Sequence, residues 1–105
     1  MKRPERALQI WQVLVGAAHN RQILTYEILA RLIGMGAGTL AQTLDIIMRY
    51  CQRRQLPPLT AIVVRKDTGL PGTGLTTPQE LNREREAVYS HAWYRQVPPQ
   101  LADFQ

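Results

Sequence analysis

Two stretches with helical periodicity are separated by only six residues, and three of those six residues are glycines. The first stretch, Tyr26 to Ile33, follows Thr25, which suits a helix N-cap, and stops at Gly34, which suits a left-handed helix end. The second stretch runs from Leu40 to about Arg54, with Thr39 as its expected cap. Its apolar stripe comprises Leu40, Leu44, Ile47, Met48 and Cys51. A connection this short predicts a helix-turn-helix.

An earlier helix completes the helical part of the expected core, which covers residues 1–75. Pro4 is tolerated in the first turn of this helix, and His19-Asn20 ends it. Its apolar residues recur at helical spacing and are Leu8, Trp11, Leu14, Val15 and Ala18. Residues 76–105 add a C-terminal helix and an aromatic tail. We expect residues 1–105 to form a single domain.

A small β-hairpin is expected after the third helix. Pro57-Pro58 prevents helix formation, and the β-branched run Thr60-Ala61-Ile62-Val63-Val64 predicts a strand. Gly69 supplies the positive φ of a turn that begins at Arg65, and an antiparallel return is expected from Leu70 onward. Three helices followed by a hairpin predict a winged helix-turn-helix. The expected fold class is therefore mainly α with a small β-hairpin and an added C-terminal helix.

The last third of the chain begins with a clear local pattern. Thr77-Pro78-Gln79-Glu80 is a capping box with proline at the first helical position, and the helix it opens extends to about Ser90. The interleaved charges of Arg83–Glu86 predict a solvated face. Ala92–Val97 is predicted to be extended, and the tail after Pro98-Pro99 is predicted to fray.

Charge divides the chain unevenly. The net charge is +5, and eleven of the 13 bases are arginine. Residues 1–66 hold ten bases and three acids, whereas residues 67–105 hold three bases and five acids. A basic first two-thirds attracts polyanions such as nucleic acid, although a surface that only improves solubility gives the same count.

Residues that carry chemistry are few. Cys51, the single cysteine, excludes a disulfide framework and predicts a reducing cytoplasm, and its place on the apolar stripe favours a buried thiol over a nucleophile. His19 and His91 lack partners at metal-ligand spacing, so no metal is expected. The glycine runs at 34–38 and 69–74 lack the lysine of a phosphate loop, so they predict turns and no cofactor. No secretory signal or stretch of roughly 18 apolar residues is found, and no membrane partner is expected.

Nucleic-acid binding is the chemistry that this pattern favours. The N-terminal part of the second helix in a helix-turn-helix enters the major groove, and farther residues meet the DNA backbone. On this helix the expected contact residues are Thr39, Gln42, Thr43, Arg49 and Arg53. Arg65 and Lys66 lie at the expected hairpin tip, where they contact phosphate as a wing or only solubilise the turn. The negative charge of Asp45, on the same helix as Gln42 and Arg49, opposes tight binding to DNA.

The run Thr25-Tyr26-Glu27-Ile28-Leu29-Ala30, continued by Arg31-Leu32-Ile33-Gly34, resembles the DNA-binding domain of alkylguanine-DNA alkyltransferases and of their catalytically silent alkyltransferase-like relatives. The segment Ile62-Val63-Val64 and the loop that starts at Asp67-Thr68-Gly69-Leu70 are also similar to the family's strand and glycine loop. The resemblance covers roughly residues 8–75. It implies a winged-helix fold, and it implies that Tyr26 contacts the DNA backbone, whereas packing at a helix start suits Tyr26 equally well.

The family's catalytic residues have no equivalents in this chain. The active-site motif, Pro-Cys-His-Arg or Pro-Trp-His-Arg in the silent members, corresponds to Pro57–Ile62, where no Cys, Trp, His or Arg occurs. The family's base-flipping arginine corresponds to Thr39 or Leu40. We therefore expect a non-enzymatic protein that binds double-stranded DNA.

A second hypothesis treats the C-terminal segment as an interaction surface. Trp93 and Tyr94 are residue types that anchor interfaces, although their amphipathic character favours a role as lids over a core. Docking through these residues and the C-terminal helix predicts a homodimer or a protein partner on a winged-helix scaffold.

Overall fold

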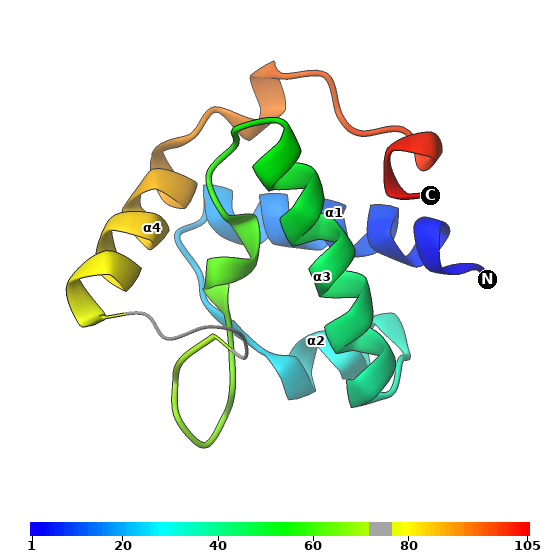
Figure 1. Cartoon of the computed structure of the whole chain (residues 1–105). Coiled ribbons are helices and arrows are strands. Elements are labelled where there is room, and N and C mark those ends of the chain that lie inside the picture. Colours follow the sequence, from blue (N-terminus) through cyan, green and yellow to red (C-terminus); the bar gives the residue numbers. More distant parts are fainter. Residues whose placement is uncertain (72–76) are drawn as a thin grey trace.

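Four α-helices carry most of residues 1–71 and 77–105, which the computed structural model describes. These helices are α1 (Arg3–His19), α2 (Tyr26–Ile33), α3 (Ala37–Arg53) and α4 (Pro78–Ser90). Shorter elements are the strands β1 (Leu24–Thr25) and β2 (Val63–Val64) and the 3₁₀-helices η1 (Leu59–Ile62), η2 (Trp93–Arg95) and η3 (Leu101–Phe104). The prediction of a mainly helical fold is confirmed. Figure 1 shows α3 lying across α1, with η1 between α3 and α4.

Local capping sets both ends of α2. The Thr25 hydroxyl accepts a hydrogen bond from the backbone N–H of Ile28 at 3.1 Å, and Gly34 ends the helix with a φ of 77°. Both features agree with the sequence prediction. Arg6 of α1 donates to the carbonyl oxygen of Ile33 at 2.8 Å, so this cation satisfies a carbonyl at the negative end of α2.

Helix α3 begins at Ala37, three residues before the predicted start. Gly36 is the N-cap, and its carbonyl oxygen accepts a hydrogen bond from the N–H of Leu40 at 3.0 Å. Thr39 therefore lies inside the first turn, and its predicted role as the cap is wrong. Alanine has the highest helix propensity, which favours the earlier start at Ala37. The turn between α2 and α3 is consequently only Gly34–Gly36.

The two strands form a parallel pair instead of the predicted antiparallel hairpin. Strand β1 pairs with β2, with Leu24 opposite Val63 and Thr25 opposite Val64. The segment before α2 therefore supplies the partner strand that was expected from Leu70 onward. Leu70 and Pro71 are not in a strand, and the rest of the expected return, from Gly72 to Thr76, lies outside the described residues.

The predicted strand at Thr60–Val64 is too long by three residues. The N–H of Ala61 donates to the carbonyl oxygen of Pro58 at 2.9 Å, which winds the chain into η1 directly after Pro57-Pro58. This turn buries Leu59 and Ile62 completely, and burial of their side chains favours it over an extended strand.

A closed loop follows β2 at residues 65–70. The Arg65 N–H donates to the Leu70 carbonyl and the Gly69 N–H donates to the Arg65 carbonyl, both at 2.8 Å. Gly69 has a φ of 69°, so the predicted turn with a left-handed glycine is confirmed. The loop projects away from the helices beside α2 (Figure 1).

An aromatic cluster at the centre of the core joins both ends of the chain. The Trp11 ring lies 5.3 Å from Tyr50 and 5.6 Å from Trp93, both edge-to-face, and 6.3 Å from Phe104. All four residues are buried. Aromatic pairs at these distances add to the free energy of area burial. The C-terminal third therefore contributes to the same core as α1 and α3.

Two C-terminal predictions are wrong because this cluster orders the tail. Trp93 lies in η2 and not in an extended segment, and its indole N–H donates to the carbonyl oxygen of Val88 at 2.8 Å. The residues after Pro98-Pro99 form η3 and do not fray, since Phe104 is only 3% exposed. Asp103 also caps η3 by accepting from the Gln100 N–H at 2.6 Å. The helix predicted from the capping box at Thr77 is confirmed as α4.

Replacing Phe104 with alanine tests the ordered tail. Because the ring fills a site between Trp11 and Tyr50, Phe104→Ala is expected to lower the free energy of unfolding by about 3 kcal/mol. Leu101→Ala, a change at a half-exposed residue of the same 3₁₀-helix, is expected to cost about 0.5 kcal/mol. Urea denaturation measures both values, and equal effects of the two substitutions would contradict an ordered tail.

Candidate nucleic-acid interface

An open groove lies between α2, the start of α3 and the loop after β2, with a volume of about 1010 Å³. We call it the α2–α3 groove. It is lined by Tyr26, Glu27, Ala30, Arg31, Ala37, Ala41, Arg65, Lys66 and Asp67. Three predicted contact residues, Tyr26, Arg65 and Lys66, are therefore brought to one surface. In Figure 1 the loop, α2 and the first turns of α3 all lie in the lower part of the molecule.

Ion pairs hold the cations around the α2–α3 groove. The Glu27 carboxylate accepts from Arg31 at 2.9 Å within α2 and lies 3.5 Å from the Lys66 ammonium of the loop. Arg65 pairs with Asp67 at 3.2 Å. Their side chains are at least half exposed, and exposed pairs contribute only about 0–1 kcal/mol each. An external phosphate can therefore replace either carboxylate at low cost.

Small side chains form much of the surface between these cations. Ala30 on α2 and Ala37 and Ala41 on α3 line the α2–α3 groove, and their short side chains leave room for a polymer backbone to approach. Tyr26 is half-buried: its ring packs against the core and also lines the groove. Packing and contact with a ligand are both compatible with this position of Tyr26.

The predicted contact residues of α3 divide between surface and core. Thr39 and Gln42 are exposed, and Gln42 accepts a hydrogen bond from Arg3 of α1 at 2.7 Å. Thr43 is completely buried, and its hydroxyl donates to the carbonyl oxygen of Thr39 at 2.8 Å. The prediction that Thr43 contacts DNA is wrong, because its helical position points to the core together with Leu40.

The two predicted arginines of α3 lie progressively farther from the α2–α3 groove. Arg49 pairs with Asp45 at 2.9 Å on the solvent side of the helix. Arg53 donates to the carbonyl oxygen of Asp103 in η3 at 2.9 Å. It lies 14 residues after Thr39, which corresponds to about 21 Å along the helix axis. Arg53 is therefore not brought together with the loop cations.

Two basic residues that lie beside α3 were not among the predicted contacts. Arg31 lines the α2–α3 groove from α2, and its spacing four residues after Glu27 indicated an ion pair on one helix face. Arg3 reaches Gln42 from the start of α1. No local sequence pattern connects Arg3 with α3, because this contact depends on how α1 and α3 pack.

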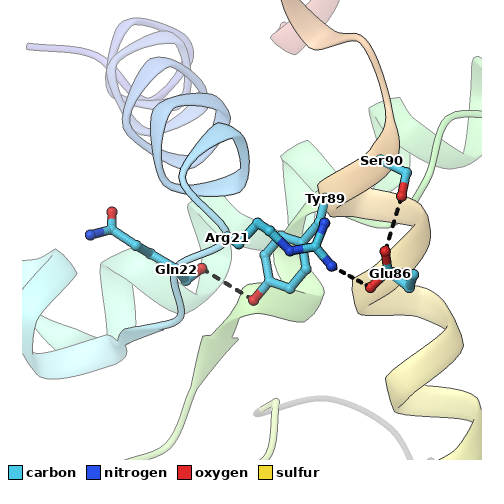
Figure 2. Close-up of polar contacts among 5 residues, drawn as sticks. All are labelled: Arg21, Gln22, Glu86, Tyr89 and Ser90. Atoms are coloured by element: carbon cyan, nitrogen blue, oxygen red, sulfur yellow. Dashed lines mark hydrogen bonds and ion pairs between the residues drawn. The ribbon is translucent and has the colours of Figure 1, made fainter.

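Helix α4 holds the segment between α1 and β1, which leads into α2 and the α2–α3 groove. Figure 2 shows Arg21 directed at Glu86, with Nη2 and Oε2 only 2.6 Å apart, while the Tyr89 hydroxyl donates to the Gln22 carbonyl at 3.4 Å. Ser90 donates to the other Glu86 oxygen at 3.2 Å. Arg21 has a φ of 55°, so these contacts hold an uncommon backbone conformation between α1 and β1.

The interleaved charges of Arg83–Glu86 predict a solvated face, but two of these side chains make contacts with other elements. Arg85 is half-buried and donates to the carbonyl oxygens of Ala61 at 3.3 Å and Gly69 at 3.4 Å. The first bond reaches η1 and the second reaches the loop that carries Lys66. Together with the Arg21–Glu86 pair, Arg85 thus links α4 to both segments that border β1 and β2.

The remaining candidate residues from the sequence are two buried side chains, Cys51 and Trp93, and the exposed Tyr94. Cys51 is 1% exposed, and burial raises the pKa of its thiol, which agrees with a buried, unreactive thiol. Trp93 is buried, so the hypothesis that it anchors a docking surface is wrong for this residue, whereas Tyr94 is exposed and meets His19 edge-on. Within residues 1–71 and 77–105, no three His, Cys, Asp or Glu side chains gather as metal ligands.

Comparison of the chain with protein-family models, with curated proteins and with solved structures finds no match. The resemblance to the alkyltransferase DNA-binding domain accordingly remains a prediction. Over the described part of the chain, no helix has both the length and the apolar character needed to cross a membrane.

The Arg21–Glu86 contact predicts a pH dependence of stability. The hydrogen bonds from Arg21 and then Ser90 lower the pKa of Glu86 in the folded state. A lowered pKa stabilises the fold above the ordinary pKa of glutamate, roughly 4.3, and this contribution is lost as the pH falls through the folded-state value. Glu86→Gln is therefore expected to be less stable than the wild type at pH 7, with a difference that narrows below about pH 4.

Urea unfolding of both proteins at pH 7 and pH 3 measures this difference. Glu84→Gln is the control, because it removes one carboxylate from the same helix and leaves the Arg21–Glu86 pair in place. A Glu86→Gln difference that is independent of pH would contradict the assigned contribution of Glu86.

Proposed function

We propose that this protein is a non-enzymatic, winged-helix-like binder of double-stranded DNA that uses α3 together with the loop after β2. The observation that carries the proposal is an exposed line of α3 with basic side chains on both of its sides. The line comprises the exposed residues Gly38, Gln42 and Arg49 and the half-buried Asp45, which recur every three or four residues on the side opposite the buried stripe.

Cations flank this line from two different parts of the chain. On one side Arg3 of α1 contacts Gln42. On the other side Arg31 of α2 and Arg65 and Lys66 of the loop line the groove beside Ala37 and Ala41. A major groove about 12 Å wide has one phosphate strand along each edge. Two basic flanks around an exposed helix therefore match a duplex whose groove accepts α3.

The electrostatic design favours exchange of internal carboxylates for phosphates. Glu27 serves both Arg31 and Lys66, so one carboxylate balances two cations. A DNA phosphate supplies the same acceptor oxygens, and binding releases condensed counterions from the duplex. Salt-dependent affinity is the property by which this mode of binding is recognised.

Fluorescence anisotropy with a labelled duplex in a salt series tests the proposal. The wild type is expected to bind with an affinity that falls as salt rises, and Arg31→Ala with Lys66→Ala is expected to reduce the slope of log K against log salt by about 2. The control Arg83→Ala with Arg95→Ala removes two charges from α4 and η2 and is expected to leave most of the slope.

Three results would contradict the proposal. The first is no measurable duplex binding at low salt. The second is an affinity that salt does not change. The third is an equal loss of slope in the control double variant, because binding would then depend on net charge and not on the α2–α3 groove.

A further inference from the structure

We infer that Arg3 and Gln42 form a hydrogen-bond donor pair that reads guanine in the major groove. The inference rests on the proposed function and deepens it by naming the ligand class: duplexes with G·C pairs under the first turns of α3. The observation behind it is the 2.7 Å hydrogen bond from Arg3 Nη2 to Gln42 Oε1.

This bond fixes which atoms Gln42 presents to a ligand. Arginine has only donors, so it pairs with the oxygen of the amide and not with its nitrogen. The amide group is planar, and holding its oxygen on Arg3 turns its NH₂ group away from Arg3. Because Gln42 lies on the exposed line of α3, the pair offers the NH₂ of Gln42 and the remaining N–H groups of Arg3 to a ligand.

The basic side chain of Arg3 does not stabilise the helix to which it belongs. Arg3 is the first residue of α1 and is exposed, and it follows Lys2 at the N-cap. Positive charges at the N-terminus of a helix oppose the helix dipole, so this arrangement disfavours the helix. The side chain instead reaches across to α3 and contacts Gln42, which is 39 residues later in the chain.

A donor pair selects among the four bases by their major-groove edges. Guanine presents two acceptors there, N7 and O6, which match two donors. Adenine presents one acceptor and one donor, and in the usual bidentate contact of glutamine with adenine the amide oxygen accepts from adenine, for which the bond from Arg3 competes. Cytosine presents an amino donor, which opposes the pair, and thymine presents a single acceptor, O4, beside a methyl group. The geometry therefore favours guanine opposite Gln42.

Asp45, three residues after Gln42 on α3, favours a cytosine at the neighbouring base position. One of its oxygens pairs with Arg49 at 2.9 Å, and a carboxylate oxygen accepts from the amino group of cytosine. Gln42 and Asp45 are three residues apart, or about 4.5 Å along the axis, close to one base step of about 3.4 Å. Asp45, which opposes phosphate binding, thus fits a neighbouring cytosine.

The test compares two duplexes of equal length, one with a central G·C block and one with a central A·T block. We expect the full-length wild type to prefer the G·C duplex by about tenfold, the discrimination typical of one bidentate contact. Replacing guanine with 7-deazaguanine, which lacks the N7 acceptor, is expected to remove most of this preference. Anisotropy at constant salt measures all three affinities.

Variants separate base reading from general attraction. Arg3→Lys keeps the charge but loses the planar fork, and Gln42→Ala removes the amide, so both are expected to lose most of the wild-type preference for the G·C duplex. Gln52→Ala, a change at another exposed glutamine of α3, is expected to keep the wild-type preference.

Equal wild-type affinity for the two duplexes, with the salt dependence intact, would overturn this inference and leave the proposed function standing. An undiminished G·C preference in Arg3→Lys and Gln42→Ala would also overturn it. Failure of the wild type to bind either duplex would overturn both proposals.

Discussion

The packing of Trp11 is the interaction on which the rest of the structure depends. Its ring meets Tyr50 of α3, Trp93 of η2 and Phe104 of η3, so one side chain joins elements from the start, middle and end of the chain. These contacts fix the end of α3 against α1. Because a helix is stiff over 17 residues, the same contacts determine where the other end of α3 lies beside α2 and the loop. The position of the α2–α3 groove follows from this core.

Acidic residues in the last third of the chain bind basic residues of the first two-thirds and so stabilise the fold. Glu86 pairs with Arg21, and the Asp103 carboxylate pairs with Arg54 at 3.4 Å, while the Asp103 carbonyl oxygen accepts a hydrogen bond from Arg53. These three arginines therefore make structural contacts. Among the residues that the structure describes, the cations around the groove, Arg31, Arg65 and Lys66, pair with Glu27 and Asp67, carboxylates on the same exposed surface. The positive charge of residues 1–66 is thus divided between structural contacts and a surface where phosphate can compete.

Sequence predicted the features that depend on neighbouring residues. Thr25, Gly34 and the capping box at Thr77 set helix ends through contacts within four residues, and these ends are confirmed. Strand β1 was missed because two residues cannot show alternation and their partner, β2, lies far along the chain. Burial of Phe104 also depends on distant residues. Thr43 is different: its spacing from Leu40 and Ile47 indicates the core, whereas its polar side chain favours exposure, and in the structure it is completely buried.

Chemical-shift mapping tests the central claim, that α2, the start of α3 and the loop after β2 form the DNA-binding surface. In a titration of the ¹⁵N-labelled protein with a short duplex, the account predicts the largest amide shift changes in Tyr26–Ile33, in Ala37–Asp45 and at residues 65–67. Changes confined to α4, η2 and η3, or no changes at low salt, would contradict it.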